Sequence, residues 1–299
     1  MGSPSIKKLK DWVEDWARNQ GAWWRIFAFL GVIALVWVPI AAVVYLAGYF
    51  LGRQGVAEIT ALVMLYGLFL KELPRWGRQV HAWALPLRRC GLVLARQTVR
   101  DLAIAMLIGV LGVFLLFGVE TLFGWASPVT PSPKLARFIL EGLIMSLAVG
   151  FAEEMMFRGW VLAELEETYP STVALVMNAL FFAGTHFIKP WAEIVRTFPQ
   201  FLGLVILGLA LVWGRRTVTG DHTQKTSRLG YPIGLHAGLI WGYYMVNVGG
   251  LSEYTGRVPE WVTGVDDNPL AGLLGILLLS AIAYQFAKVA EKKTQPTQP

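Results

Sequence analysis

The stretch FILEGLIMSLAVGFAEEMMFR (residues 138–158) joins a long apolar run to a cluster of charged side chains. The run is typical of a membrane-spanning helix, yet Glu153, Glu154 and Arg158 follow it within six residues. At membrane depth an ionisable group costs several kcal/mol unless it is paired or faces a polar cavity. We therefore expect these three side chains to be functional; the alternative is a solvated helix end whose charges reach the membrane surface.

The spacing of the charges separates their roles. Glu154 and Arg158 are four residues apart, so on a helix they share a face and can pair. Glu153 is rotated by about 100° from Glu154 and is left without a dedicated partner. A carboxylate in that position, held among apolar groups, is suited to act as an acid or a base. The sequence therefore predicts that Glu153 carries the chemistry.

The composition places the chain in the membrane. Of the 299 residues 55% are hydrophobic and only 15% are charged, whereas about 25% are charged in an ordinary soluble domain. We predict an all-α, polytopic membrane protein. The single cysteine, Cys90, excludes an intramolecular disulfide and a cysteine-based metal cluster.

Eight apolar segments predict about eight transmembrane helices. They are residues 26–51, 56–70, 102–123, a segment from about 135 into the charged motif, 172–187, 198–213, 232–248 and 270–287. We divide the chain into an amphipathic interfacial segment (1–25), N-terminal transmembrane helices (26–134), a core that contains the charged motif (135–248), and a loop with the last helix and a polar tail (249–299).

The basic residues predict the orientation in the membrane. With eight spans, 20 of the 26 Lys and Arg residues fall on one side, which by the positive-inside rule places both termini in the cytoplasm. Residues 72–100 hold six arginines among tryptophans. In a membrane protein this favours a segment lying on anionic lipid, so we expect the lipid bilayer and not nucleic acid as its partner.

Two histidines lie alone in apolar segments, His186 at the end of the fifth predicted span and His236 at the start of the seventh. Glu153 and His186 lie equally far from the turn at Tyr169-Pro170. In an antiparallel helix pair that rises 1.5 Å per residue, they would lie at the same level. A carboxylate facing an imidazole is either an acid–base pair or two ligands of a metal.

We interpret the other polar residues of this region as structural. His81 and His222 fall in basic connections and are expected to be solvated. Glu164, Glu166 and Glu167 are expected to form the solvated face of a helix that extends past the membrane. Asn178 is expected to be a helix-packing residue. Gly234 and Gly238, which flank His236, are expected to let its helix approach a neighbour closely.

Three elements in order, Glu153-Glu154-x-x-x-Arg158, Phe182-x-x-x-His186 and the late His236, are similar to the CPBP family, which comprises type 2 CAAX prenyl proteases and bacteriocin-processing proteins. These are intramembrane endopeptidases, often described as metalloproteases. The resemblance covers about residues 135–247 and makes the segment 135–248 the CPBP-like catalytic core. It implies that Glu153 and His186 activate the hydrolytic water, that Glu154 and Arg158 hold the site together, and that His236 stabilises the oxyanion.

The chain departs from the family pattern four residues after His236. The family has Asn or Asp there, and this chain has Ile240, which cannot donate a hydrogen bond. Loss of one oxyanion donor typically lowers the rate by ~10²–10³. Either Tyr243 or Asn247 substitutes for it, or activity is weakened.

The expected function is hydrolysis of a peptide bond in a membrane-associated protein or peptide. Zinc is a candidate ion, with Glu153, His186 and His236 as its ligands, but the same residues could activate water directly, and we expect no tightly bound metal. A catalytically weak or inactive scaffold that binds partner proteins is the first alternative. A proton-coupled transporter is the second, and the lack of an internal repeat argues against it.

Overall fold

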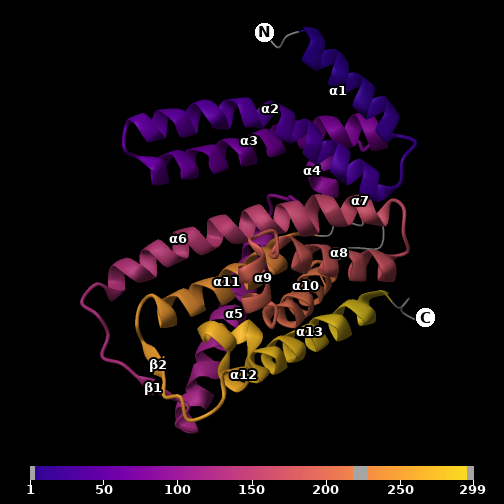
Figure 1. Ribbon diagram of the computed structural model, residues 1–299. Coiled ribbons are helices and arrows are strands. Elements are labelled where there is room, and N and C mark those ends of the chain that lie inside the picture. Colours follow the sequence, from indigo (N-terminus) through magenta and orange to yellow (C-terminus); the bar gives the residue numbers. More distant parts are fainter. Residues whose placement is uncertain (1–3, 218–227, 295–299) are drawn as a thin grey trace, which may run out of the picture. The chain divides into compact units, whose positions relative to one another are not determined.

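The computed structural model describes residues 4–217 and 228–294, and most of these residues are helical (Figure 1). The all-α fold class is confirmed. The helices are α1 (Pro4–Ala17), α2 (Ala22–Phe50), α3 (Gln54–His81), α4 (Pro86–Arg89), α5 (Arg96–Leu122), α6 (Leu135–Glu154), the π-helical segment η1 (Met155–Val161), α7 (Leu162–Glu166), α8 (Ser171–Thr185), α9 (Trp191–Thr197), α10 (Gln200–Arg216), α11 (Gly230–Asn247), α12 (Glu260–Thr263), the 3₁₀ turns η2 (Val265–Asp267) and η3 (Pro269–Ala271), and α13 (Leu273–Thr294). Strands β1 (Ala126–Pro128) and β2 (Ser252–Tyr254) pair antiparallel.

All eight predicted spans fall on helices. Within the described residues, four helical stretches are long and apolar enough to cross a membrane: Ala22–Phe50, Arg96–Leu122, Leu135–Glu166 and Leu273–Glu291. The pair α9 and α10, bent by 73°, would add a fifth. These apolar helices support an integral membrane protein, while the count of eight and the cytoplasmic location of the termini stay predictions.

The described chain forms two compact units. One comprises the residues up to Arg89 together with Ala163–Thr168, and the other comprises Cys90–Leu162 and the described residues from Tyr169 onward. The helix that carries the charged motif therefore runs through α6 and η1 in the second unit and ends in the first. The four sequence-based segments stay a prediction.

In the first unit, α2 and α3 lie side by side, as Figure 1 shows. Phe29 on α2 packs against Phe69 and Trp76 on α3, with ring centroids 5.9 and 5.1 Å apart. Helix α1 is joined to α3 by ion pairs. In one of them Lys10 Nζ lies 2.8 Å from Glu72 Oε1. The prediction that the N-terminal segment forms an amphipathic helix is consistent with α1, on which Trp12 stays 63% exposed.

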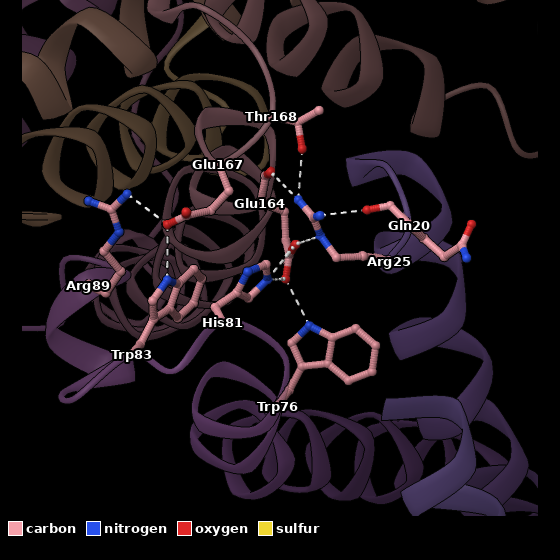
Figure 2. A network of polar contacts seen from close by, with 9 residues as sticks. All are labelled: Gln20, Arg25, Trp76, His81, Trp83, Arg89, Glu164, Glu167 and Thr168. Atoms are coloured by element: carbon pink, nitrogen blue, oxygen red, sulfur yellow. Dashed lines mark hydrogen bonds and ion pairs between the residues drawn. The ribbon is translucent and has the colours of Figure 1, made fainter. Parts of the chain in front are cut away.

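A buried carboxylate lies at the centre of a network of polar contacts in this unit (Figure 2). Glu164 is fully buried, and its oxygens accept hydrogen bonds from Arg25 Nε at 2.9 Å, Trp76 Nε1 at 2.8 Å and His81 Nε2 at 2.9 Å. The expectation that Glu164 and His81 are solvated is therefore wrong. A buried charge is tolerated when ion pairs and hydrogen bonds replace its water, and the three partners supply them. His222 lies outside the described residues.

The same network extends to two neighbouring residues. Arg25 Nη2 also donates to Thr168 Oγ1 at 2.8 Å. Glu167 Oε1 accepts from Trp83 Nε1 and from Arg89 Nη2, both at 3.0 Å (Figure 2). The side chains of Glu167 and its partner Arg89 are more exposed than those of Glu164 and its partner Arg25. Together they fasten the segment Ala163–Thr168 to α2, α3 and the region of α4.

In the second unit, α11 packs closely against α5. A Cβ atom on Gly234 would overlap the carbonyl oxygen of Leu102, and one on Gly238 would overlap that of Met106. The helices thus meet backbone to backbone, which confirms the predicted close approach around His236.

We expect Gly238→Ala to destabilise the protein by about 1–3 kcal/mol, because α5 and α11 must separate to admit the methyl group. Thermal unfolding in detergent measures the change. Gly118→Ala on α5 is the matched control, since a Cβ there meets no atom within 4 Å and alanine favours the helix. Equal unfolding temperatures for the two variants would contradict the close-packing argument.

Candidate active site

Glu154 is the centre of a buried polar cluster in the second unit. Its Oε1 lies 2.9 Å from Arg158 Nη1 and 2.8 Å from His236 Nδ1. Glu154, Arg158 and His236 are all buried. The predicted pairing of Glu154 with Arg158 is confirmed. The bond to His236, 82 residues further along the chain, was not predicted.

The charged motif lies where the helix changes its geometry. Glu154 is the last residue of α6, and Arg158 lies in the π-helical segment η1 that follows directly. A π-helix shifts the hydrogen bond from the fourth to the fifth residue, and such segments occur frequently at functional sites. The wider turn therefore begins immediately after the two glutamates.

The contacts of His236 fix its tautomer. A carboxylate accepts hydrogen bonds, so the Nδ1 atom that faces Glu154 carries a proton. The other ring nitrogen, Nε2, lies 3.9 Å from Glu153 Oε2, which is too far for a direct hydrogen bond. Among the described residues Glu153 Oε2 has no hydrogen-bond partner, although the side chain as a whole is 32% exposed. Both glutamates therefore face one imidazole, and Glu153 remains chemically available.

His186 follows the last residue of α8. Its Nδ1 lies 2.8 Å from the carbonyl oxygen of Phe182. Since a carbonyl only accepts, Nδ1 carries the proton and the neutral ring presents Nε2 as an acceptor. An imidazole in this state can take a proton from water. That Glu153 and His186 share one level in the membrane stays a prediction.

Phe182 links the two histidines and the arginine. Its ring centroid lies 4.7 Å from that of His186 and 6.1 Å from that of His236, in edge-to-face geometry. The Arg158 guanidinium carbon lies 4.0 Å from the same centroid, a cation–π contact. The spacing Phe182-x-x-x-His186 pointed to this residue but predicted no physical role for its ring.

The residues considered as zinc ligands do not fit a metal ion in this geometry. Throughout residues 4–217 and 228–294, no group of three or more His, Cys, Asp or Glu side chains could hold one. The Nδ1 atoms of His186 and His236 each bond to a carbonyl or carboxylate oxygen, which leaves Nε2 as the only nitrogen that either ring could offer to an ion. Because the described residues contain no suitable group of ligands, a metalloprotease site formed by Glu153, His186 and His236 is not supported.

The two residues considered as substitutes for a donor at position 240 make other contacts. Tyr243 donates from its hydroxyl to the carbonyl oxygen of Asp267 at 2.8 Å, and Asn247 Nδ2 donates to the Tyr243 hydroxyl at 2.7 Å. Both groups thus bond toward the loop that follows α11. In this geometry they do not replace the donor that Ile240 lacks.

Comparison with known proteins gives one match. Residues 135–242 match the family model described as "Type II CAAX prenyl endopeptidase Rce1-like". No curated protein and no solved structure matches the chain. The matched segment includes Glu153, Glu154, Arg158, His186 and His236, and it contains the buried cluster around Glu154. Residues 135–242 are therefore similar to the type II CAAX prenyl endopeptidase Rce1-like family, and this match supports the predicted resemblance to the CPBP family.

Proposed function

We propose that this protein is an intramembrane endopeptidase that hydrolyses a peptide bond with a water activated by Glu153 and His186. The observation that carries the proposal is the buried Glu154, which holds Arg158 and His236 and so brings the His236 ring to 3.9 Å from Glu153. Glu154 makes structural hydrogen bonds, whereas Glu153 keeps a carboxylate oxygen available to accept a proton. An acid–base site needs a carboxylate of this second kind.

The charges of the cluster support a role for His236 as a hydrogen-bond donor to the oxyanion. Its Nδ1 proton is held by Glu154, so only Nε2 can face a substrate. We propose that the ring acts as an imidazolium, which would place a positive charge between the carboxylates of Glu154 and Glu153. Nε2 then carries a proton and can stabilise the negative charge that develops on the substrate carbonyl oxygen.

We propose that Glu153 and His186 handle the water. The Glu153 side chain is partly exposed while its Oε2 atom is buried, and Oε2 makes no competing hydrogen bond within the described part of the chain. His186 offers Nε2 as a second acceptor. In the first step the water gives a proton to Glu153 as its oxygen attacks the carbonyl carbon. In the second, Glu153 returns the proton to the leaving amine.

The substrate class follows from the membrane setting and the family. Within the described residues four helical stretches are apolar enough to span a membrane, so we propose that the substrate is itself a membrane-associated protein or peptide that enters sideways. The family description names prenylated CAAX proteins, which are one such class. A non-catalytic scaffold that binds partner proteins is the second candidate function, and Ile240 is the observation in its favour.

The experiment follows cleavage of a prenylated CAAX peptide by membranes that contain the protein, with His236→Ala compared with the unchanged chain. We expect kcat to fall by ~10²–10³, since the variant removes the oxyanion donor. Asn247→Ala, on the same helix but bonded to Tyr243, is the control and should keep its activity. Equal rates for all three proteins would contradict the role of His236.

A further inference from the structure

Three consecutive backbone carbonyls in the π-helical segment η1 accept hydrogen bonds from side chains of other helices. Asn178 Nδ2, from α8, donates to the carbonyl oxygen of Phe157 at 2.8 Å. Arg215 Nη1, from α10, donates to the carbonyl oxygen of Arg158 and, at 3.3 Å, to that of Gly159. Asn178 is fully buried and Arg215 is 3% exposed. Two helices thus bind the wide turn at adjacent peptide groups.

These contacts explain why the helix widens at this point. In an α-helix each carbonyl accepts an amide hydrogen four residues on, and breaks in that ladder arise where a side chain inserts into it. The carbonyls of Phe157, Arg158 and Gly159 receive side-chain donors, and that of Phe157 also accepts the amide hydrogen of Leu162, five residues on. Burying a guanidinium is costly unless it is well hydrogen-bonded. Arg215 meets that requirement in part by donating to backbone carbonyls of η1. Its buried guanidinium therefore depends on this turn.

The turn determines where Arg158 lies. The backbone carbonyl of Arg158 is held by Arg215, while its guanidinium bonds to Glu154 and lies over the ring of Phe182. A change in the turn would therefore move the guanidinium relative to Glu154. Because Glu154 also holds His236, the displacement would pass to the imidazole that faces Glu153.

We propose that Asn178 and Arg215 are positioning residues that hold the π-helical turn and thereby set the geometry of the Glu154, Arg158 and His236 cluster. The inference rests on the proposed hydrolysis. The contacts of Asn178 and Arg215 with the turn, which we call the clamp, can be tested without a substrate. Asn178 was expected to be a helix-packing residue. It does join α8 to η1, and its specific contact is the Phe157 carbonyl.

The native thiol supplies a reporter of the turn. Cys90 is the single cysteine and is buried. A Cβ added to Gly159 would lie 3.1 Å from the Cys90 carbonyl oxygen and 3.6 Å from the Cys90 Cβ, so this glycine packs directly on the cysteine. If η1 loosens, Gly159 moves and the thiol becomes accessible. The rate at which a maleimide labels Cys90 in detergent therefore reports whether the clamp is intact.

The activity experiment compares Arg215→Gln, Arg215→Lys and Asn178→Asp with the unchanged chain, using the prenylated CAAX peptide as substrate. We expect Arg215→Gln and Asn178→Asp to lower kcat by about tenfold to 10²-fold with KM unchanged, because a small displacement of catalytic groups has that effect. Arg215→Lys should recover part of kcat, since an ammonium can reach one carbonyl as a point charge. Arg216→Gln is the control, because Arg216 donates to the Ser171 carbonyl instead.

The labelling experiment uses the same four variants. We expect Cys90 to react faster in Arg215→Gln and Asn178→Asp than in the unchanged chain and in Arg216→Gln. Unchanged labelling and unchanged kcat in both clamp variants would overturn the proposal, as would a loss of kcat that Arg216→Gln shares. If Arg215→Gln does not accumulate, Arg215→Lys and Asn178→Asp decide the matter. If the unchanged chain cleaves no substrate, the proposed function fails, while the labelling rates still test the clamp.

Discussion

Glu153→Gln is expected to lower kcat for cleavage of a membrane-associated substrate by about 10²–10⁴-fold, because a carboxamide cannot accept the proton of the attacking water. Glutamine has nearly the same shape as glutamate. Glu153 is 32% exposed and forms no hydrogen bond at Oε2 among the described residues. The variant should therefore fold as the unchanged chain does. The measurement is cleavage in membranes at matched expression, with His186→Ala as a second variant that should also lose activity.

The control for this experiment lies on the same helix. Glu141 precedes Glu153 by twelve residues and forms an exposed ion pair with Arg137, with Arg137 Nε 2.6 Å from Glu141 Oε1. Exposed pairs of this kind contribute about 0–1 kcal/mol to stability, so Glu141→Gln should keep full activity. Full activity in both Glu153→Gln and His186→Ala would refute the protease and leave the scaffold as the function.

Glu164→Ala is expected to destabilise the protein by about 3–5 kcal/mol. The variant leaves the buried guanidinium of Arg25 and the indole N–H of Trp76 without their main partner, and breaking a buried pair from one side has a cost of that size. Unfolding of the detergent-solubilised protein by heat, followed by circular dichroism, measures the effect. The stability of Glu164→Gln should lie between that of the unchanged chain and that of Glu164→Ala, because its amide oxygen still accepts from Trp76 while the ion pair is lost.

Glu167 provides the matched comparison three residues away. It also bonds to a tryptophan and an arginine, Trp83 and Arg89, but its side chain and that of Arg89 are 31% and 40% exposed. Glu167→Ala should therefore cost no more than about 1 kcal/mol. Similar losses in Glu164→Ala and Glu167→Ala would show that burial of the Glu164 carboxylate does not govern its contribution.

The sequence predicted the helices well, because an apolar run is a local signal and each of the eight runs forms a helix. It failed at Glu164 and His81, which lie in polar stretches and were expected to be solvated. The partners of Glu164 are 83 to 139 residues away in the chain. No local pattern distinguishes a carboxylate that meets water from one that meets a distant arginine, so burial of this kind cannot be read from the neighbouring residues.

For the site too, the sequence predicted local contacts and missed those between residues far apart in the chain. The pairing of Glu154 with Arg158 follows from helical spacing, but its bond to His236 depends on how α6 and α11 pack. The π-helical turn had no signal either, because Met155–Val161 continues the helical pattern without a proline. The donors that contact it, Asn178 on α8 and Arg215 on α10, reach the turn only in the folded chain.

The glycine contact between α5 and α11 has a consequence for how this protein can vary. His236 lies between Gly234 and Gly238, whose backbone rests directly on that of α5. The depth of the imidazole is therefore fixed by main chain against main chain and does not depend on which side chains fill the surrounding core. Substitutions on the faces of α5 and α11 that point away from this contact should therefore leave the depth of the imidazole unchanged. A methyl group added on the glycine face would force the two backbones apart and shift it.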